Sequence, residues 1–172
     1  MNLYELHTNP ESLYGYEQIR EKYTKPSLET CQQMMAETHG HLDFRKFPYS
    51  MVTQLPSNLT VDGELNINRT QITQLPDNLT VGESLFLQVT QIPITQLPDN
   101  LTINGSFSLN NTHITHIGDN LTVGKYLDLR NTPITHIGNN LTVLGYLYLR
   151  NTPSLDKDNL PTDMQVLGIV YR

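Results

Sequence analysis

Three histidines are the residues whose type and spacing most invite metal chemistry. His116 and His136 occupy equivalent places in a repeated segment, and His113 lies just before the first of them. Imidazole nitrogens are common zinc ligands, and two of them side by side come within ligand range. The same repeat position carries Gln74 and Gln96 earlier in the chain. We therefore expect a polar surface column at these positions and no metal site.

The other reactive side chains form no catalytic pattern. Cys31 is the single cysteine and has no evident base beside it, so we expect a buried, inert thiol. The sequence carries no glycine-rich phosphate loop, no nucleophile elbow and no paired-carboxylate motif. We expect a protein that is not an enzyme and that needs no cofactor.

Composition narrows the class of partner and the location. A net charge of −6 and an isoelectric point near 5.4 disfavour nucleic acid, which requires a basic surface. The sequence has no apolar run long enough to span a membrane, and its first thirty residues lack the pattern of a signal peptide. A single cysteine cannot form an internal disulfide. We expect a cytoplasmic protein that does not bind membranes.

The histidines described above belong to a segment that recurs about every 20 residues. Residues 55–61 (LPSNLTV) return in close variants, which is the signature of a solenoid. A degenerate coil starts at Gly40, whose neighbourhood resembles residues 145–150. The regular coils are predicted at 55–74, 75–96, 97–116, 117–136 and 137–159, with a truncated coil at 160–172.

Alternation within each coil predicts strands. In residues 127–134 apolar and polar side chains alternate, so Leu127 and Leu129 should be buried. Leu121 and Val123 alternate in the same way and predict a second, shorter strand on the opposite side of the coil. Glycines follow that strand in every coil, and we expect them to supply turns with positive φ: Gly63, Gly82, Gly105, Gly124 and Gly145.

The first 39 residues follow a helical pattern instead. One helix is predicted from Asn9 to about Thr24, and a second from about Pro26 to a cap at Gly40, with Leu28, Met34 and Met35 as candidate buried residues. The predicted fold is thus a β-rich repeat solenoid of parallel strands stacked in coils over residues 40–172. Residues 1–39 form a small N-terminal α-helical cap on its first coil.

The repeat resembles a known family in its consensus. Leu65-x-Ile67-x-x-Thr70-x-Ile72, followed by Leu75-Pro76, is similar to the signature of short, 20-residue bacterial or phage-type leucine-rich repeats. The resemblance covers residues 40–172 and implies a protein-binding scaffold. Threonine replaces the usual ladder asparagine, so hydroxyls are expected to meet the buried backbone amides. Residues 3–10 also resemble a leader of bacteriophage accessory proteins, which implies an inhibitor of a host defence factor in the host cell cytoplasm.

Comparison of the coils with one another separates the constant positions from a variable surface. Tyrosine and arginine gather on the variable columns of the last coils, as they do in the energetically dominant parts of protein interfaces. The predicted partner-binding residues are Tyr126, Asp128, Arg130, Tyr146, Tyr148, Arg150 and Tyr171. Arg130 and Arg150 would be neighbours, which favours an acidic partner. In the alternative, Asp128 neutralises Arg130 internally and the tyrosines pack on one another.

The end of the array is the second candidate surface. Met164, Val166 and Val170 match the inward columns, but no capping helix follows them in the sequence. Uncovered apolar side chains and strand edges predict self-association, and a closed, isologous homodimer through this end is the form we expect. The alternative is a short final coil that is blunted by Pro161 and Arg172.

Two other functions stay open at this stage. A carbohydrate-binding solenoid would use Tyr126, Tyr146, Tyr148 and Asp128 to line a groove. An acidic decoy that mimics nucleic acid would need a stripe of carboxylates, but the carboxylates are scattered over turns: Asp62, Glu64, Asp77, Glu83, Asp99 and Asp119. Another protein, of identity that the sequence does not disclose, is the partner we expect.

Overall fold

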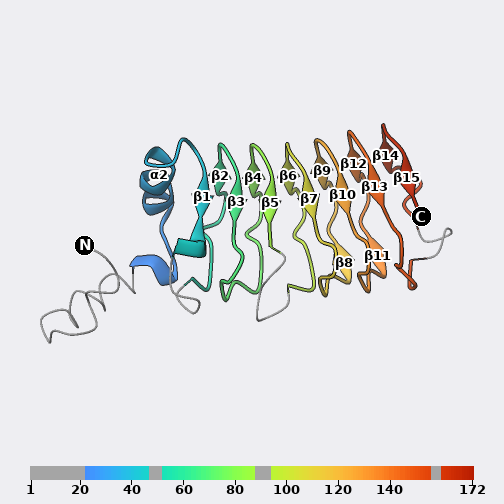
Figure 1. The fold of residues 1–172 in the computed structure, drawn as a ribbon, viewed down its shortest axis with the longest axis horizontal. Helices are drawn as coiled ribbons and strands as arrows, with labels where there is room; N and C mark the ends of the chain where they lie inside the picture. Colours follow the sequence, from blue (N-terminus) through green and yellow to red (C-terminus); the bar gives the residue numbers. More distant parts are fainter. Residues whose placement is uncertain (1–21, 47–51, 88–93, 156–159) are drawn as a thin grey trace, which may run out of the picture.

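The computed structural model describes residues 22–46, 52–87, 94–155 and 160–172. It shows the predicted fold, a solenoid in which parallel strands stack coil upon coil, with a helical segment at its N-terminal end (Figure 1). The first predicted helix lies mostly outside the described residues. Of that helix, only residues 22–24 are described, and these are helical.

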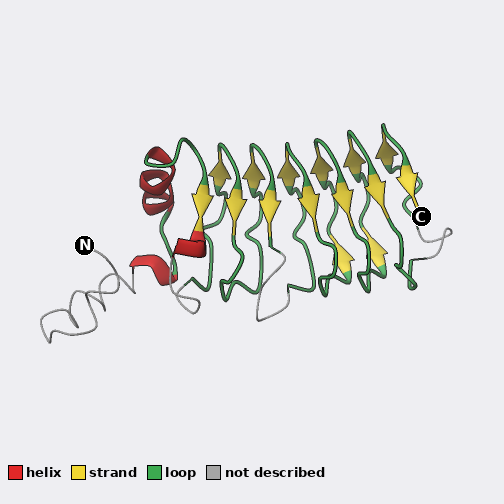
Figure 2. Cartoon of the chain, viewed as in Figure 1, coloured by secondary structure: helices red, strands yellow, loops and turns green. Residues whose placement is uncertain are grey.

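Two sheets run the length of the solenoid, and every strand in them has two residues. The front sheet has the strand order β1 (Leu42–Asp43), β3 (Leu65–Asn66), β5 (Leu85–Phe86), β7 (Phe107–Ser108), β10 (Leu127–Asp128), β13 (Leu147–Tyr148) and β15 (Val170–Tyr171). The rear sheet contains β2 (Thr60–Val61), β4 (Thr80–Val81), β6 (Thr102–Ile103), β9 (Thr122–Val123), β12 (Thr142–Val143) and β14 (Gln165–Val166). Figure 2 shows the two sheets as rows of yellow arrows.

A third, small sheet was not predicted. It consists of β8 (His116–Ile117) and β11 (His136–Ile137), which pair in parallel at the side of two neighbouring coils. Its inward residues, Ile117 and Ile137, are buried, and its histidines face solvent.

Strand register confirms the predicted length of each coil. Leu65 pairs with Leu85, Leu85 with Phe107, Phe107 with Leu127, Leu127 with Leu147, and Leu147 with Val170. Subtracting these numbers gives steps of 20, 22, 20, 20 and 23 residues, so the second and fifth coils are the longer ones. Leu42 pairs with Leu65, which confirms the degenerate coil that starts at Gly40. The residues that lengthen the two coils, around 91–93 and 156–159, lie outside the described residues in large part.

The core is one continuous column of aliphatic side chains along the solenoid axis. A single inner coil, residues 117–136, contributes six residues that are almost fully buried: Ile117, Leu121, Val123, Leu127, Leu129 and Ile134. Both predicted alternations are therefore correct, since the front and rear strands of a coil each turn their apolar residues inward. No coil could bury this set without its neighbours, and stacking is what stabilises the fold.

The glycines serve a different purpose from the one predicted. None of the five has a positive φ, and Gly40 is the one described glycine that does. A Cβ atom at Gly82, Gly124 or Gly145 would come within 1.9–2.0 Å of a carbonyl oxygen in the preceding coil. Close approach between stacked backbones therefore excludes a side chain at these turns.

Glycine alternates between two positions from turn to turn. The turns that join the rear and front sheets are the pairs 62–63, 82–83, 104–105, 124–125, 144–145 and 167–168. Glycine stands second in the first of these turns, first in the next, and alternates through the fifth, whereas in the sixth turn it stands second again. Each turn thus combines one glycine with one residue that carries a side chain.

Asparagines, rather than glycines, adopt the left-handed conformation. Asn58, Asn78, Asn100, Asn120 and Asn140 all have φ between 56° and 60°, at equivalent places before the rear strands. Their side chains form a ladder in which Asn120 Nδ2 donates to Asn100 Oδ1 and Asn140 Nδ2 donates to Asn120 Oδ1, each at 3.0 Å. A second ladder joins Asn111, Asn131 and Asn151. Asparagine suits these positions because it tolerates positive φ and also links adjacent coils.

This dual role predicts different outcomes for two substitutions of Asn120. Asn120→Ala should lower the free energy of unfolding by about 2 kcal/mol, since alanine strains a positive φ and removes both ladder bonds. Asn120→Gly should cost about half as much, because glycine keeps the backbone conformation and loses only the ladder. Urea denaturation followed by circular dichroism measures both. Equal losses for the two variants would contradict the role assigned to φ.

The threonine hydroxyls donate hydrogen bonds to backbone carbonyls, whereas the sequence predicted that they would accept from backbone amides. The hydroxyls of Thr70, Thr112, Thr132 and Thr152 donate to the carbonyl oxygen three residues earlier, at 2.6–2.7 Å. One amide, that of Ile72, also approaches the Thr70 hydroxyl, at 3.5 Å. A hydroxyl satisfies a carbonyl inside its own coil, whereas the asparagine amides connect successive coils.

Helix α2 (Leu28–Ala36) packs on the first strand of the front sheet. Ser27 caps its start by accepting a hydrogen bond from the Thr30 amide. At its end, the Gly40 amide donates to the Met35 carbonyl oxygen, as expected of a C-terminal cap. Cys31 and Met35 are buried, but Leu28, predicted to be buried, is 42% exposed. Burial raises the pKa of the Cys31 thiol to about 11, in keeping with an inert residue.

Candidate functional site

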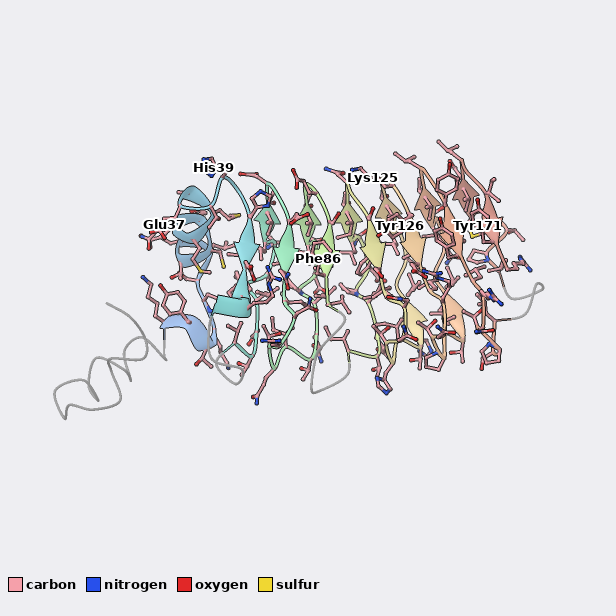
Figure 3. All side chains as sticks on the ribbon, in the orientation of Figure 1. Glu37, His39, Phe86, Lys125, Tyr126 and Tyr171 are labelled. Carbon is pink, nitrogen blue, oxygen red and sulfur yellow. The ribbon has the colours of Figure 1, made fainter. Side chains whose placement is uncertain are left out.

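Four of the predicted partner-binding residues are tyrosines that lie together on the front sheet. Tyr126, Tyr146 and Tyr171 are exposed, and Tyr148 is half-buried. The strand register brings them together, since Tyr148 on β13 pairs with Tyr171 on β15. In Figure 3, Tyr126 and Tyr171 lie along the C-terminal half of the front sheet, with Phe86 on the same sheet nearer the helix. We call Tyr126, Tyr146, Tyr148 and Tyr171 the tyrosine cluster.

Ring contacts hold the tyrosine cluster together. Tyr148 and Tyr171 stack face to face, with ring centroids 4.9 Å apart and planes 9° from parallel. Tyr146 contacts both of them at 6.0–6.5 Å, and Tyr126 meets Tyr148 edge to face at 6.2 Å. These pairings match the prediction that the tyrosines pack on one another. They also fix the rings in place before any partner binds.

Tyr148 is enclosed on both faces. The guanidinium of Arg130, from the preceding coil, lies over its ring at 5.3 Å from the centroid. Tyr171, from the following coil, covers the other face. A partner can therefore reach the edge and hydroxyl of Tyr148, whereas both of its ring faces are already occupied.

Asp128 and Arg130 form the internal ion pair of the alternative prediction. Arg130 Nε and Nη2 donate to the two carboxylate oxygens of Asp128 at 2.9 and 2.7 Å. The hydrogen bond and the charge of Asp128 raise the pKa of Arg130 above its usual value. Asp128, predicted as a contact residue, is only 4% exposed, so it offers a partner little surface of its own. It positions Arg130, which in turn covers Tyr148.

The same pairing occurs at the opposite end of the solenoid. Asp43 and Arg45 occupy the columns of Asp128 and Arg130, and Arg45 Nη2 lies 2.7 Å from Asp43 Oδ2. No tyrosine cluster lies near this pair in the described residues. The Asp-x-Arg ion pair is therefore a local feature of individual strand ends. The tyrosine cluster is what distinguishes the C-terminal coils.

Arg150 differs from Arg130 in having no carboxylate two residues before it. Two residues before Arg150 stands Tyr148, in the column that Asp128 occupies in the preceding coil. The Arg150 side chain is exposed and makes no hydrogen bond or ion pair with the residues that the structure describes. Because Asp128 neutralises Arg130, Arg150 is an exposed cation beside the tyrosine cluster that has no carboxylate partner among the described residues.

A group of exposed aliphatic residues was missed in the sequence. Leu144, Leu167 and Ile169 are 50%, 72% and 55% exposed, beside the tyrosine cluster. Leu167 and Ile169 flank the turn between β14 and β15. The signal was available, since the earlier residues in these two columns are small or polar, such as Asp62 and Glu64, and become apolar only in the last coils.

The remaining predicted residues lie at the surface or at the last coil. His113, His116 and His136 are exposed, and the rings of His116 and His136 are 5.8 Å apart. Within the described ranges, no three His, Cys, Asp or Glu side chains are grouped to hold a metal ion. Met164, Val166 and Val170 are half-buried against the core at the open end.

Comparisons with known proteins add no assignment. No family model matches the chain, and neither a curated protein nor a solved structure is significantly similar to it. None of the described helices is both long and apolar enough to cross a membrane. The chain is thus defined by its own geometry, as a solenoid of stacked parallel-strand coils with a tyrosine cluster near one end.

Proposed function

We propose that this protein is a non-enzymatic binding protein that engages another protein through the front sheet of its C-terminal coils. The observation that carries the proposal is the tyrosine cluster, a contiguous set of largely exposed rings beside Arg150, which has no carboxylate partner among the described residues. Tyrosine and arginine supply large contact areas with a polar end, which is why they dominate interface energetics.

The scaffold favours tight binding because the contact residues are ordered in advance. Ring packing fixes the tyrosines, and the ion pair with Asp128 fixes Arg130. Side chains that are already immobile lose little conformational entropy on association. The mechanism we propose is occlusion or tethering of the partner by a preformed surface.

The geometry favours a protein over a carbohydrate as the ligand. Sugar binding of the predicted kind would use Tyr148 and Asp128 to line a groove. Tyr148 has both ring faces occupied, and Asp128 is buried with both oxygens bound to Arg130. What the surface offers is ring edges, hydroxyls and the Arg150 guanidinium, which suit an acidic and partly apolar protein surface.

An acidic nucleic-acid decoy has less support. Asp99 and Asp119 each accept a hydrogen bond from a backbone amide of the next coil, at 2.8 and 2.7 Å. These carboxylates serve the turns of the solenoid. Loss of partner binding at moderate salt would favour the decoy, because a ligand held by charge is screened.

The leucine-rich-repeat class and a biological role form the finer part of the proposal. The consensus of residues 65–76 supports a short leucine-rich repeat, a class of scaffold that mainly binds proteins. The resemblance of residues 3–10 to leaders of bacteriophage accessory proteins makes a host defence factor the first partner to test. Those residues lie outside the described ranges, so this role is supported by sequence alone.

Binding measurements with matched variants test the proposal. The intact chain is used to capture partners from a lysate of its native host, and the captured protein is then titrated in a calorimeter. Tyr146→Ala and Arg150→Ala should each weaken affinity at least tenfold, because both side chains are exposed at the centre of the surface.

The matched control is Phe86→Ala, an aromatic residue in the same front sheet two coils before the cluster. It should leave the affinity unchanged. Full binding by the Tyr146 and Arg150 variants, together with loss in Phe86→Ala, would refute the assigned face. Saturable binding of an oligosaccharide, with no protein captured, would favour the carbohydrate function.

A further inference from the structure

Within the part of the chain that the structure describes, the C-terminal coil leaves one edge of each sheet unpaired. β15 is the last strand of the front sheet, and β14 is the last strand of the rear sheet. No described strand pairs with their outer sides. Open edges of this kind pair with other chains unless something covers them.

The outer side of each edge presents one valine. In β14 the amides of Gln165 and Leu167 donate back to the preceding coil, so the N–H and C=O of Val166 between them point outward. In β15 the carbonyls of Ile169 and Tyr171 accept from the preceding coil, so the N–H and C=O of Val170 point outward.

This arrangement suits antiparallel pairing with an identical edge. Two residues that both point N–H and C=O at each other form the hydrogen-bonded pair of an antiparallel ladder. Val166 would pair with Val166 of a second copy, and Val170 with Val170. Because the two valines lie on either side of the same turn, one two-fold axis perpendicular to the solenoid can satisfy both edges.

The side chains around these edges are apolar. Val166, Val170 and Met164 are half-buried, whereas the equivalent residues of inner coils are fully buried. In the antiparallel register, Ile169 lies opposite Tyr171 of the second copy, an aliphatic and aromatic pair of the kind that stabilises sheets. Leu167, the most exposed large apolar residue described, lies in the turn between β14 and β15 and would face the second copy.

A cavity at the same end of the solenoid could receive the turn between β14 and β15 of a second copy. A cavity of about 290 Å³ lies beside Arg172, lined mainly by Leu149, Thr152, Pro153, Leu155 and Leu160. The turn and the cavity lie on opposite sides of β15. A two-fold axis through the valines moves the turn of each copy toward the cavity of the other.

At the other end of the solenoid, the first described strands of the two sheets, β1 and β2, have fully buried apolar residues, unlike β14 and β15. Helix α2 packs on β1, and Leu42 in that strand is fully buried. Head-to-tail stacking into fibres is thus disfavoured, and association through the C-terminal end alone closes after two copies.

We propose that two copies of this chain associate end to end through β14 and β15, with antiparallel pairing that continues both sheets across a two-fold axis. The dimer does not rest on the proposed binding function, although Tyr171 belongs to both surfaces. It places two tyrosine clusters on one extended structure.

Sedimentation of the full chain tests this dimer. The chain of 19.6 kDa should sediment at twice that mass and dissociate on dilution. Leu167→Lys should raise the dissociation constant of the dimer at least tenfold, since it places a charge in the contact, and should retain the circular dichroism spectrum because the side chain is exposed. Leu28→Lys is the matched control, an exposed leucine at the opposite end, and should remain dimeric.

Cross-linking tests the register separately. Cα atoms of a hydrogen-bonded antiparallel pair lie about 5.5 Å apart, within the range that a disulfide spans. Val170→Cys should give a reducible covalent dimer on mild oxidation, and Leu28→Cys should give none. The native Cys31 does not compete, because it is fully buried. A monomer at all concentrations, or equal cross-linking of the two cysteine variants, would overturn the proposal.

Discussion

Gly124→Ala is expected to lower the free energy of unfolding by at least about 3 kcal/mol. A Cβ atom at Gly124 would lie 2.0 Å from the carbonyl oxygen of Asn104 and 2.7 Å from its carbon. Both atoms belong to the backbone, so no rotamer change relieves the clash and the coils must separate locally. Urea denaturation followed by circular dichroism measures the loss.

The neighbouring residue provides the control for this prediction. Lys125 occupies the other position of the same turn, is exposed, and should tolerate Lys125→Ala within about 0.5 kcal/mol. Similar losses at the two positions would show that general turn propensity, rather than close approach of the coils, explains the glycine.

Phe107→Ala is expected to cost about 4 kcal/mol, the usual range for removing a buried aromatic ring. Phe107 is fully buried in the middle of the core, between Leu85 and Leu127 of the adjacent coils. Because each coil contacts mainly its neighbours, the cavity weakens the junction between the two halves of the array. The m-value in urea should therefore fall along with the stability, as the halves begin to unfold separately.

Ser106→Ala is the control, since it alters a half-buried residue beside Phe107 without touching the core. It should change stability by less than about 0.5 kcal/mol. A Phe107→Ala protein that unfolds in one transition with an unchanged m-value would mean that coupling extends beyond adjacent coils.

The register and the core could be predicted from the sequence because they depend on side-chain period. Leu65, Leu85, Phe107, Leu127 and Leu147 repeat at fixed positions, and any other register would expose them. The longer coils were detected for the same reason, since extra residues shift the pattern without breaking it.

Backbone conformation was harder to infer. Glycine and asparagine both tolerate positive φ, and glycine was the wrong choice here because the distance between adjacent coils is not visible in one coil's sequence. The direction of the Thr70 hydroxyl bond was missed for a similar reason. A hydroxyl can donate or accept, and only the positions of nearby carbonyls decide which it does.

The candidate site was predicted in outline. The tyrosine columns follow from the register, but the burial of Asp128 depends on how Arg130 folds back over it. The exposed Leu167 and Ile169 were overlooked, although the change from small or polar to apolar residues along their columns was visible in the sequence. Their significance emerges only when β14 and β15 are seen to be the last strands of their sheets.

Glycine alternates between the two turn positions from Gly63 to Gly145, but the last two turns are of the same kind, because Gly145 and Gly168 both stand second. The stacking of the coils therefore accepts two successive turns of one kind. Recombination between two similar repeats that removes or adds a single coil would create another such pair. The array of this protein can thus change in length by one repeat at a time without leaving its fold.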